Sequence, residues 1–207
     1  WTEESKAILT DMANGNWGVY EPVDINLFGS VSIEKYDSVN GQTAQGEATL
    51  AGAKFQVINR SANSVKVGDK IYAPGDVICE LTTDAKGTAK TGNVFPIGTY
   101  EIKEVAAPTG YLLNTQWKQT FSVTAEKKDH SFTYADGTGC PDTVIAGKIQ
   151  ISKKIVNTID ELSAAEAGAK FSVTDSKGNV VDTIVTGDNG VGISKDLPYG
   201  TYTVKQI

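Results

Sequence analysis

The stretch "IGTYEIKE" at residues 97–104 recurs as "YGTYTVKQ" at residues 199–206. Both alternate apolar and polar residues with a period of two, which is typical of a half-buried β-strand. Three further blocks recur in the same order: "GSVSIEK" at 29–35 with "GKIQISK" at 147–153, "LAGAKFQV" at 50–57 with "EAGAKFSV" at 166–173, and "TTDAKG" at 82–87 with "VTGDNG" at 185–190. The chain therefore contains two copies of one domain.

Turn-forming residues separate the matched blocks. Gly, Asn, Asp and Pro gather in "DSVNGQT" at 37–43, "DAKG" at 84–87, "APTG" at 107–110 and "DSKGN" at 175–179. Short strands punctuated by such turns predict an all-β fold of two tandem immunoglobulin-like β-sandwiches. Two stretches depart from this pattern. Residues 59–78 have no counterpart in the second copy and predict an inserted hairpin, and "NTIDELSAAEAGA" at 157–169 could hold a short helical turn.

The repeats predict a division into residues 29–146 and 147–207, with residues 1–28 outside them. Residues 1–28 could be a leader segment or the closing strands of an earlier repeat. The second copy stops after its fourth block, so we expect the chain to be part of a longer protein. Its closing strands are expected either to have been removed or to come from another molecule, and we favour removal.

The composition excludes several classes of protein. Of 207 residues, 40% are hydrophobic and 21% charged, which is ordinary globular usage, and no apolar run approaches the roughly 20 residues that span a bilayer. The net charge of −6 disfavours contact with nucleic acid or anionic lipid. One His and two Cys are too few for an ordinary zinc site. We therefore expect no metal, no cofactor, no nucleic acid and no membrane contact.

Two ionisable residues of the first copy fall on strand faces that should be buried. Lys35 follows Val31 and Ile33 at a period of two, and Glu104 follows Ile102 in the same way. A buried Lys is rare unless it is paired. From the pattern alone, Lys35 could reach water at a sheet edge or form a buried ion pair with Glu104.

The chain resembles the collagen-adhesin B-type repeats, also called SpaA-like prealbumin-fold domains, of Gram-positive surface proteins and pilins. The resemblance rests on "VSIEKYD" at 31–37, "LAGAKFQV" at 50–57, "TTDAKG" at 82–87 and "GTYEIKEVAAPTGYLL" at 98–113. In that family a first-strand Lys joins an Asn or Asp of the last strand through an isopeptide bond, promoted by a Glu. The resemblance implies that Lys35 is the nucleophile and Glu104 the promoter. Asp142 is the best acceptor, and Asp136 is a weaker one because "ADGTG" is typical of a turn.

The chemistry of such a site follows from burial. An ammonium is not a nucleophile, but a low-dielectric core disfavours charged groups and so favours a neutral amine facing protonated carboxyls. Glu104 could then move protons and polarise the Asp142 carbonyl. The fold holds the amine and the carbonyl together, which replaces a bimolecular step. The reaction would happen once per molecule, so the chain is not an enzyme.

The second copy departs from this pattern. Lys153 matches Lys35, but Gln206 stands where Glu104 stands in the first copy. A Gln cannot exchange the required proton, and the acceptor strand has no counterpart in the second copy. We therefore expect Lys153 and Gln206 to be inactive.

Cys79 and Cys140 leave two possibilities open. In an exported protein they could form a disulfide. Cys79, within "DVICELT", could instead be an ordinary buried thiol. A nucleophilic Cys is disfavoured, because the only His, His130, lies in a polar stretch that predicts a solvated loop.

The resemblance implies a stalk or shaft segment of an extracellular, cell-wall-anchored adhesin or pilin of a Gram-positive bacterium. Its partners would be neighbouring repeats. An alternative is a ligand-binding adhesin domain that contacts a host protein or glycan, and a third is an accessory module of a secreted enzyme.

Overall fold

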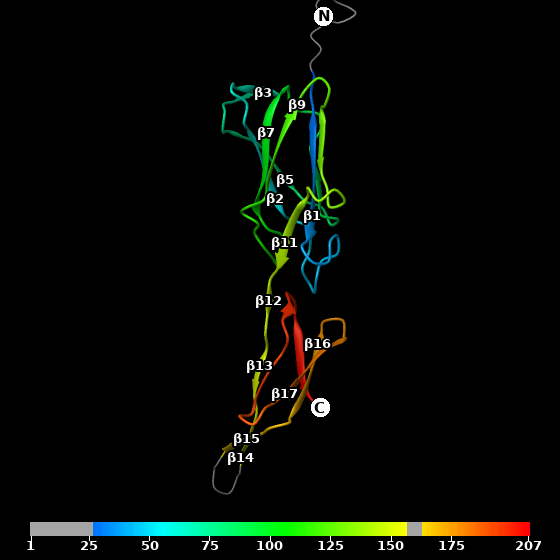
Figure 1. Cartoon of the computed structure of the whole chain (residues 1–207), viewed down its shortest axis with the longest axis vertical. Coiled ribbons are helices and arrows are strands. Elements are labelled where there is room, and N and C mark those ends of the chain that lie inside the picture. Colours follow the sequence, from blue (N-terminus) through cyan, green and yellow to red (C-terminus); the bar gives the residue numbers. More distant parts are fainter. Residues whose placement is uncertain (1–26, 157–162) are drawn as a thin grey trace, which may run out of the picture.

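The computed structural model describes residues 27–156 and 163–207, and all regular secondary structure in these two ranges is β-strand. The prediction of an all-β fold is therefore confirmed. Figure 1 shows the two repeats end to end along the long axis of the molecule. Within the described ranges, no helix is long and apolar enough to cross a membrane.

One sheet of the first repeat is built around its first strand. In the order β10-β1-β11-β8, with β6 also paired to β1, its strands are β10 (Asp129–Phe132), β1 (Ser30–Asp37), β11 (Cys140–Val144), β8 (Tyr111–Leu112) and β6 (Thr88–Lys90). Both β10 and β11 run parallel to β1, with His130 opposite Val31 and Cys140 opposite Lys35. The last strand of the repeat therefore lies directly beside the first (Figure 1).

The second sheet is antiparallel and faces the first. In the order β5-β2-β7-β9, its strands are β5 (Val77–Thr82), β2 (Lys54–Asn59), β7 (Gly98–Ala106) and β9 (Lys118–Val123). Buried apolar side chains of both sheets form one core, among them Val31, Ile33, Phe55, Tyr100 and Phe121. The alternation of apolar and polar residues in the sequence therefore corresponds to side chains that point in turn to the core and to solvent.

The predicted insertion within 59–78 is a hairpin of β3 (Val65–Val67) and β4 (Lys70–Tyr72). Its turn contains Gly68, whose φ of 58° favours glycine. The buried Asn59 side chain donates hydrogen bonds to two carbonyls, that of Asn63 just before the hairpin and that of Tyr72 in β4.

The second repeat consists of shorter sheets. Three of these sheets have two strands each: β12 (Ala146–Gly147) with β19 (Leu197–Pro198), β13 (Gln150–Ser152) with β18 (Val191–Ile193), and β14 (Lys154–Val156) with β15 (Ser163–Ala165). A fourth sheet has three strands in the order β17 (Val180–Val185), β16 (Lys170–Asp175) and β20 (Tyr202–Gln206). Its buried core is small and contains Val173, Ile184 and Leu197.

Two predictions about loops need correction. Residues 163–165 of the expected helical turn form strand β15, because they pair with β14 and gain ladder hydrogen bonds. His130 lies in strand β10 and not in a solvated loop, with Nε2 3.0 Å from the Ser122 carbonyl oxygen. Residues 157–162 and the alternatives for residues 1–26 lie outside the described parts of the chain.

Candidate functional site

Strand β1 places Lys35 inside the sandwich. Residues 31, 33, 35 and 37 of this strand are all buried, and the Lys35 side chain is completely inaccessible to solvent. Its Nζ lies 2.6 Å from Asp142 Oδ1 and 3.6 Å from Glu104 Oε1. The structure thus brings together the three residues that the sequence singled out, from β1, β7 and β11.

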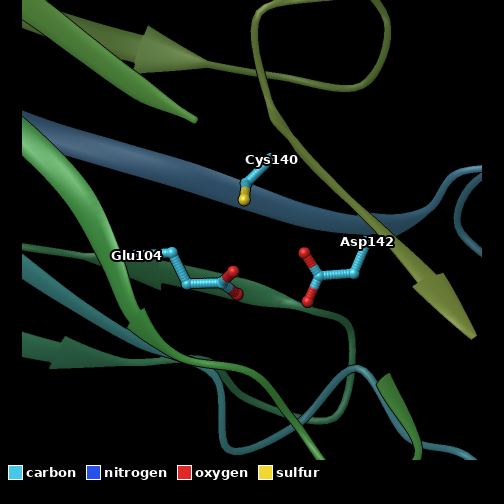
Figure 2. A group of neighbouring side chains, drawn as sticks. All are labelled: Glu104, Cys140 and Asp142. Atoms are coloured by element: carbon cyan, nitrogen blue, oxygen red, sulfur yellow. The ribbon is translucent and has the colours of Figure 1, made fainter. Parts of the chain in front are cut away.

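Glu104 reaches this site from the opposite sheet. It follows the buried Tyr100 and Ile102 on the inner face of β7, and its side chain is also completely inaccessible. Figure 2 shows the carboxyl groups of Glu104 and Asp142 pointing toward each other. One Glu104 oxygen, Oε2, accepts a hydrogen bond from the Asn114 backbone N–H at 3.0 Å, which leaves Oε1 directed at Lys35 and Asp142.

The carboxyl oxygens of the site have few donors around them. Within the part of the chain that the structure describes, no protein group donates a well-aligned hydrogen bond to Glu104 Oε1 or to either oxygen of Asp142. The close Asp142–Lys35 contact is therefore an ion pair rather than a geometrically good hydrogen bond. Removing two charges from water is costly unless both are well hydrogen-bonded, so this pair is poorly stabilised as separate ions.

Burial shifts the acid–base balance of both carboxyls. It raises the pKa of Glu104 to about 7, an effect that the nearby Lys35 cation opposes and the Asp142 charge reinforces. Burial also raises the pKa of Asp142, again against the influence of Lys35. A carboxyl with a pKa near neutrality can both accept and return a proton at physiological pH.

Cys140 lies between these groups and was not assigned to the site from the sequence. Its backbone carbonyl accepts a hydrogen bond from Lys35 Nζ at 3.0 Å, and its Sγ lies 3.5 Å from the same nitrogen (Figure 2 shows its thiol beside the two carboxyls). The signal was available, because Cys140 precedes Asp142 by two residues and so shares its face of the strand.

A metal ion is not needed to explain this cluster. Ligand atoms of Glu104, Cys140 and Asp142 lie within 4.8 Å of one another. The Lys35 ammonium, however, already supplies a cation at 2.6 Å from Asp142. Burial also raises the pKa of the Cys140 thiol far above its ordinary value, whereas a metal ligand must be a thiolate.

Asn114 is a second residue that sequence reasoning missed. Besides the backbone bond to Glu104, its side-chain Nδ2 donates to the Pro141 carbonyl at 2.8 Å. Its Oδ1 accepts from the backbone of Gln116 and Trp117, which fixes the loop after β8. One residue thus links the Glu104 carboxylate to the strand that carries Asp142.

The other sequence-predicted residues lie elsewhere. Asp136 is exposed in a turn, where it accepts hydrogen bonds from Thr138 and Thr133. Cys79 lies on β5 in the opposite sheet, and both cysteines are free thiols, so the disulfide that the sequence left open is not formed. Burial raises the pKa of the Cys79 thiol to about 11, so it stays protonated at neutral pH.

The second repeat has the same framework, but the two residues that match Lys35 and Glu104 are accessible to solvent. Gln206 lies opposite Phe171 as Glu104 lies opposite Phe55, so the two positions are equivalent. Gln206 is exposed, however, and the Lys153 side chain is 32% accessible, 3.6 Å from Glu166.

Comparison with known protein families matches residues 29–138 and 147–207 to the SpaA prealbumin-like fold domain. The chain belongs to this family and contains its domain twice. Comparison with curated protein sequences gave no match.

Three solved structures match this chain to different degrees. The Bacillus anthracis TIE protein is 24% identical with a TM-score of 0.62, and the match covers 87% of this chain and 29% of that one. A streptococcal ancillary pilin is 19% identical (TM-score 0.40, covering 88% and 54%), and a C-terminal fragment of the Lactobacillus rhamnosus GG pilus adhesin SpaC is 15% identical (TM-score 0.46, covering 86% and 75%). The chain therefore spans under a third of the first protein and about half of the second. The likeness to the TIE protein shows a shared fold.

Proposed function

We propose that the first repeat condenses Lys35 with Asp142 to form an intramolecular isopeptide bond, and that the chain serves as a load-bearing segment of a Gram-positive surface adhesin or pilin. The observation that carries this proposal is the 2.6 Å approach of Lys35 Nζ to Asp142, with both side chains inaccessible to solvent. Membership of the SpaA prealbumin-like family supports the extracellular, cell-wall-anchored setting.

The bond-forming step balances without any external reagent. Lys35 transfers a proton to the carboxyl pair, and the neutral amine attacks Cγ of Asp142. The first proton stays on the Asp142 carboxyl, and Glu104, with a pKa near 7, accepts the second proton from the attacking nitrogen and returns it to the departing hydroxyl. The N–C bond forms, the C–O bond breaks and one water leaves, so an ammonium and a carboxylate become a neutral amide. This outcome removes both buried charges, which favours the product in an apolar core.

The mechanical role follows from the position of the bond. Strands β1 and β11 run parallel as the first and last strands of the repeat. A force that enters at Ser30 and leaves at Val144 would pass through β1, the bond and β11. The chain between Lys35 and Asp142 would carry no load, so the sandwich could not unfold by extension.

Single-molecule stretching tests this role. A polyprotein with this chain between marker domains should show no extension from the first repeat and a short one from the second. Lys35→Ala should restore the full unfolding length of the first repeat. Extension of the wild-type first repeat at forces that unfold ordinary domains would contradict the proposal.

A further inference from the structure

The two repeats meet where the loop at residues 44–49 of the first repeat contacts the turn at residues 199–201 of the second. One residue, Ile145, separates β11 from β12, so the repeats are joined almost directly. The Glu47 backbone N–H donates to the Tyr199 carbonyl at 2.8 Å. Glu47 Oε2 accepts two further hydrogen bonds, from the Thr201 N–H at 2.9 Å and the Thr201 hydroxyl at 3.1 Å.

The loop is held in place before it meets the second repeat. The buried Asp37 carboxylate accepts hydrogen bonds from the Val39 and Asn40 backbones and from the Gln45 side chain. Gly46 has a φ of 59°, and a side chain there would collide with the Tyr199 carbonyl oxygen. The loop is therefore shaped for close approach to the turn that contains Tyr199.

The matching turn of the first repeat is hydrogen-bonded to a residue of its own repeat. This turn, at 97–100, has its Thr99 N–H bonded at 2.9 Å to the Ser61 hydroxyl, at the start of the inserted segment. The second repeat has a tight turn at 176–179 in place of the insertion. The Thr201 N–H of the second repeat therefore does not meet a residue of such an insertion. It donates instead to the Glu47 carboxylate of the first repeat.

Within the described residues, the loop at 44–49 that contacts this turn occurs in the first repeat. Ile155 stands where Asp37 stands in the first copy, and it is exposed. An Ile cannot order a loop by accepting hydrogen bonds. The second repeat thus presents a turn that can be docked but, within its described residues, no equivalent of the loop at 44–49.

We propose that residues 44–49 are a docking surface for the Gly-Thr-Tyr turn of a following repeat that lacks the insertion, and that Glu47 fixes the two repeats as one rigid rod. The partner is defined by its chemistry: a turn with a free backbone N–H and a neighbouring hydroxyl. Hydrogen bonds from Ser176 and Thr201 also hold the pKa of Glu47 below its usual range, so it stays a charged acceptor at neutral pH. The inference does not depend on the isopeptide bond.

Residual dipolar couplings of the full chain test the joint. In the wild type, couplings from both repeats should fit one common alignment tensor. Glu47→Ala should give two distinct tensors, while each repeat still fits its own structure and so remains folded. Glu126→Ala, an exposed Glu of the first repeat, is the matched control and should keep one tensor.

Two results would overturn the proposal. Distinct tensors in the wild-type chain would show that the repeats move independently. A single common tensor in Glu47→Ala would show that the carboxylate does not set the joint.

Discussion

Lys35 and Asp142 lie at opposite ends of the first repeat in sequence, yet Lys35 Nζ and Asp142 Oδ1 are 2.6 Å apart. The contact exists because β1 and β11 are parallel neighbours with Lys35 opposite Cys140, two residues before Asp142. A contact between adjacent parallel strands is held by the sheet itself. This geometry would give the amine and the carboxyl the proximity that condensation needs.

Glu104→Gln should keep the fold and slow bond formation by about 10²–10⁴-fold, because the amide preserves shape but cannot carry a proton. The substitution copies the second repeat, where Gln206 occupies the equivalent position. The measurement is the uncrosslinked fraction against time after refolding, by intact mass. Glu101→Gln, on the same strand but paired with Arg60, is the control and should crosslink at the wild-type rate.

Lys35→Ala should lower the free energy of unfolding of the first repeat by about 4–5 kcal/mol, since the bond would close a loop of about 108 residues. Chemical denaturation monitored by NMR separates the two repeats. Lys153→Ala is the matched control, because that side chain is partly exposed and should change stability little. Equal effects of the two substitutions on their own repeats would argue against a covalent bond at Lys35.

The stability of Lys35→Ala should depend on pH in a defined direction. The pKa of Glu104 is raised from 4.5 to about 7 by burial, and the lost lysine was lowering it. A group with a raised pKa in the folded state stabilises the fold below its unfolded pKa, and this stability is lost as pH rises through the folded pKa. The unfolding free energy should therefore fall as pH rises from about 4.5 through 7 and beyond.

The double variant Lys35→Ala/Glu104→Gln supplies the control for this pH dependence. It lacks the titrating Glu104 and should show a shallower slope over the same window. A stability of Lys35→Ala that is flat or rises between these pH values would contradict the raised pKa of Glu104.

Asn114→Ala should slow crosslinking and destabilise the first repeat by about 1 kcal/mol, the usual net contribution of one hydrogen bond. The loss removes the Nδ2 bond to Pro141 and loosens the loop whose backbone orients Glu104. Gln116→Ala, in the same loop but exposed, is the control. A normal crosslinking rate in Asn114→Ala would show that strand β11 does not need this brace.

The strand faces could be predicted from sequence because period-two alternation reports which side chains point inward. Lys35 and Glu104 stood out for this reason, as ionisable residues in register with Val31 and Ile102. Strand neighbours are different, because parallel pairing between distant segments leaves no local pattern. The spacing of two places Cys140 on the same strand face as Asp142, but the proximity of either residue to Lys35 depends on that register, and the bond from Asn114 to Pro141 depends on a loop conformation. Residues 163–165 of the predicted helical turn form a strand because pairing with β14 outweighed local preference.

The intact mass of the purified, reduced chain tests the central claim most directly. Condensation of Lys35 with Asp142 predicts a mass one water (about 18 Da) below that of the sequence, and a branched peptide after digestion that joins the Lys35 and Asp142 segments. Reduction beforehand removes any contribution from a disulfide. An unmodified mass, with Lys35 recovered in an ordinary linear peptide, would contradict it.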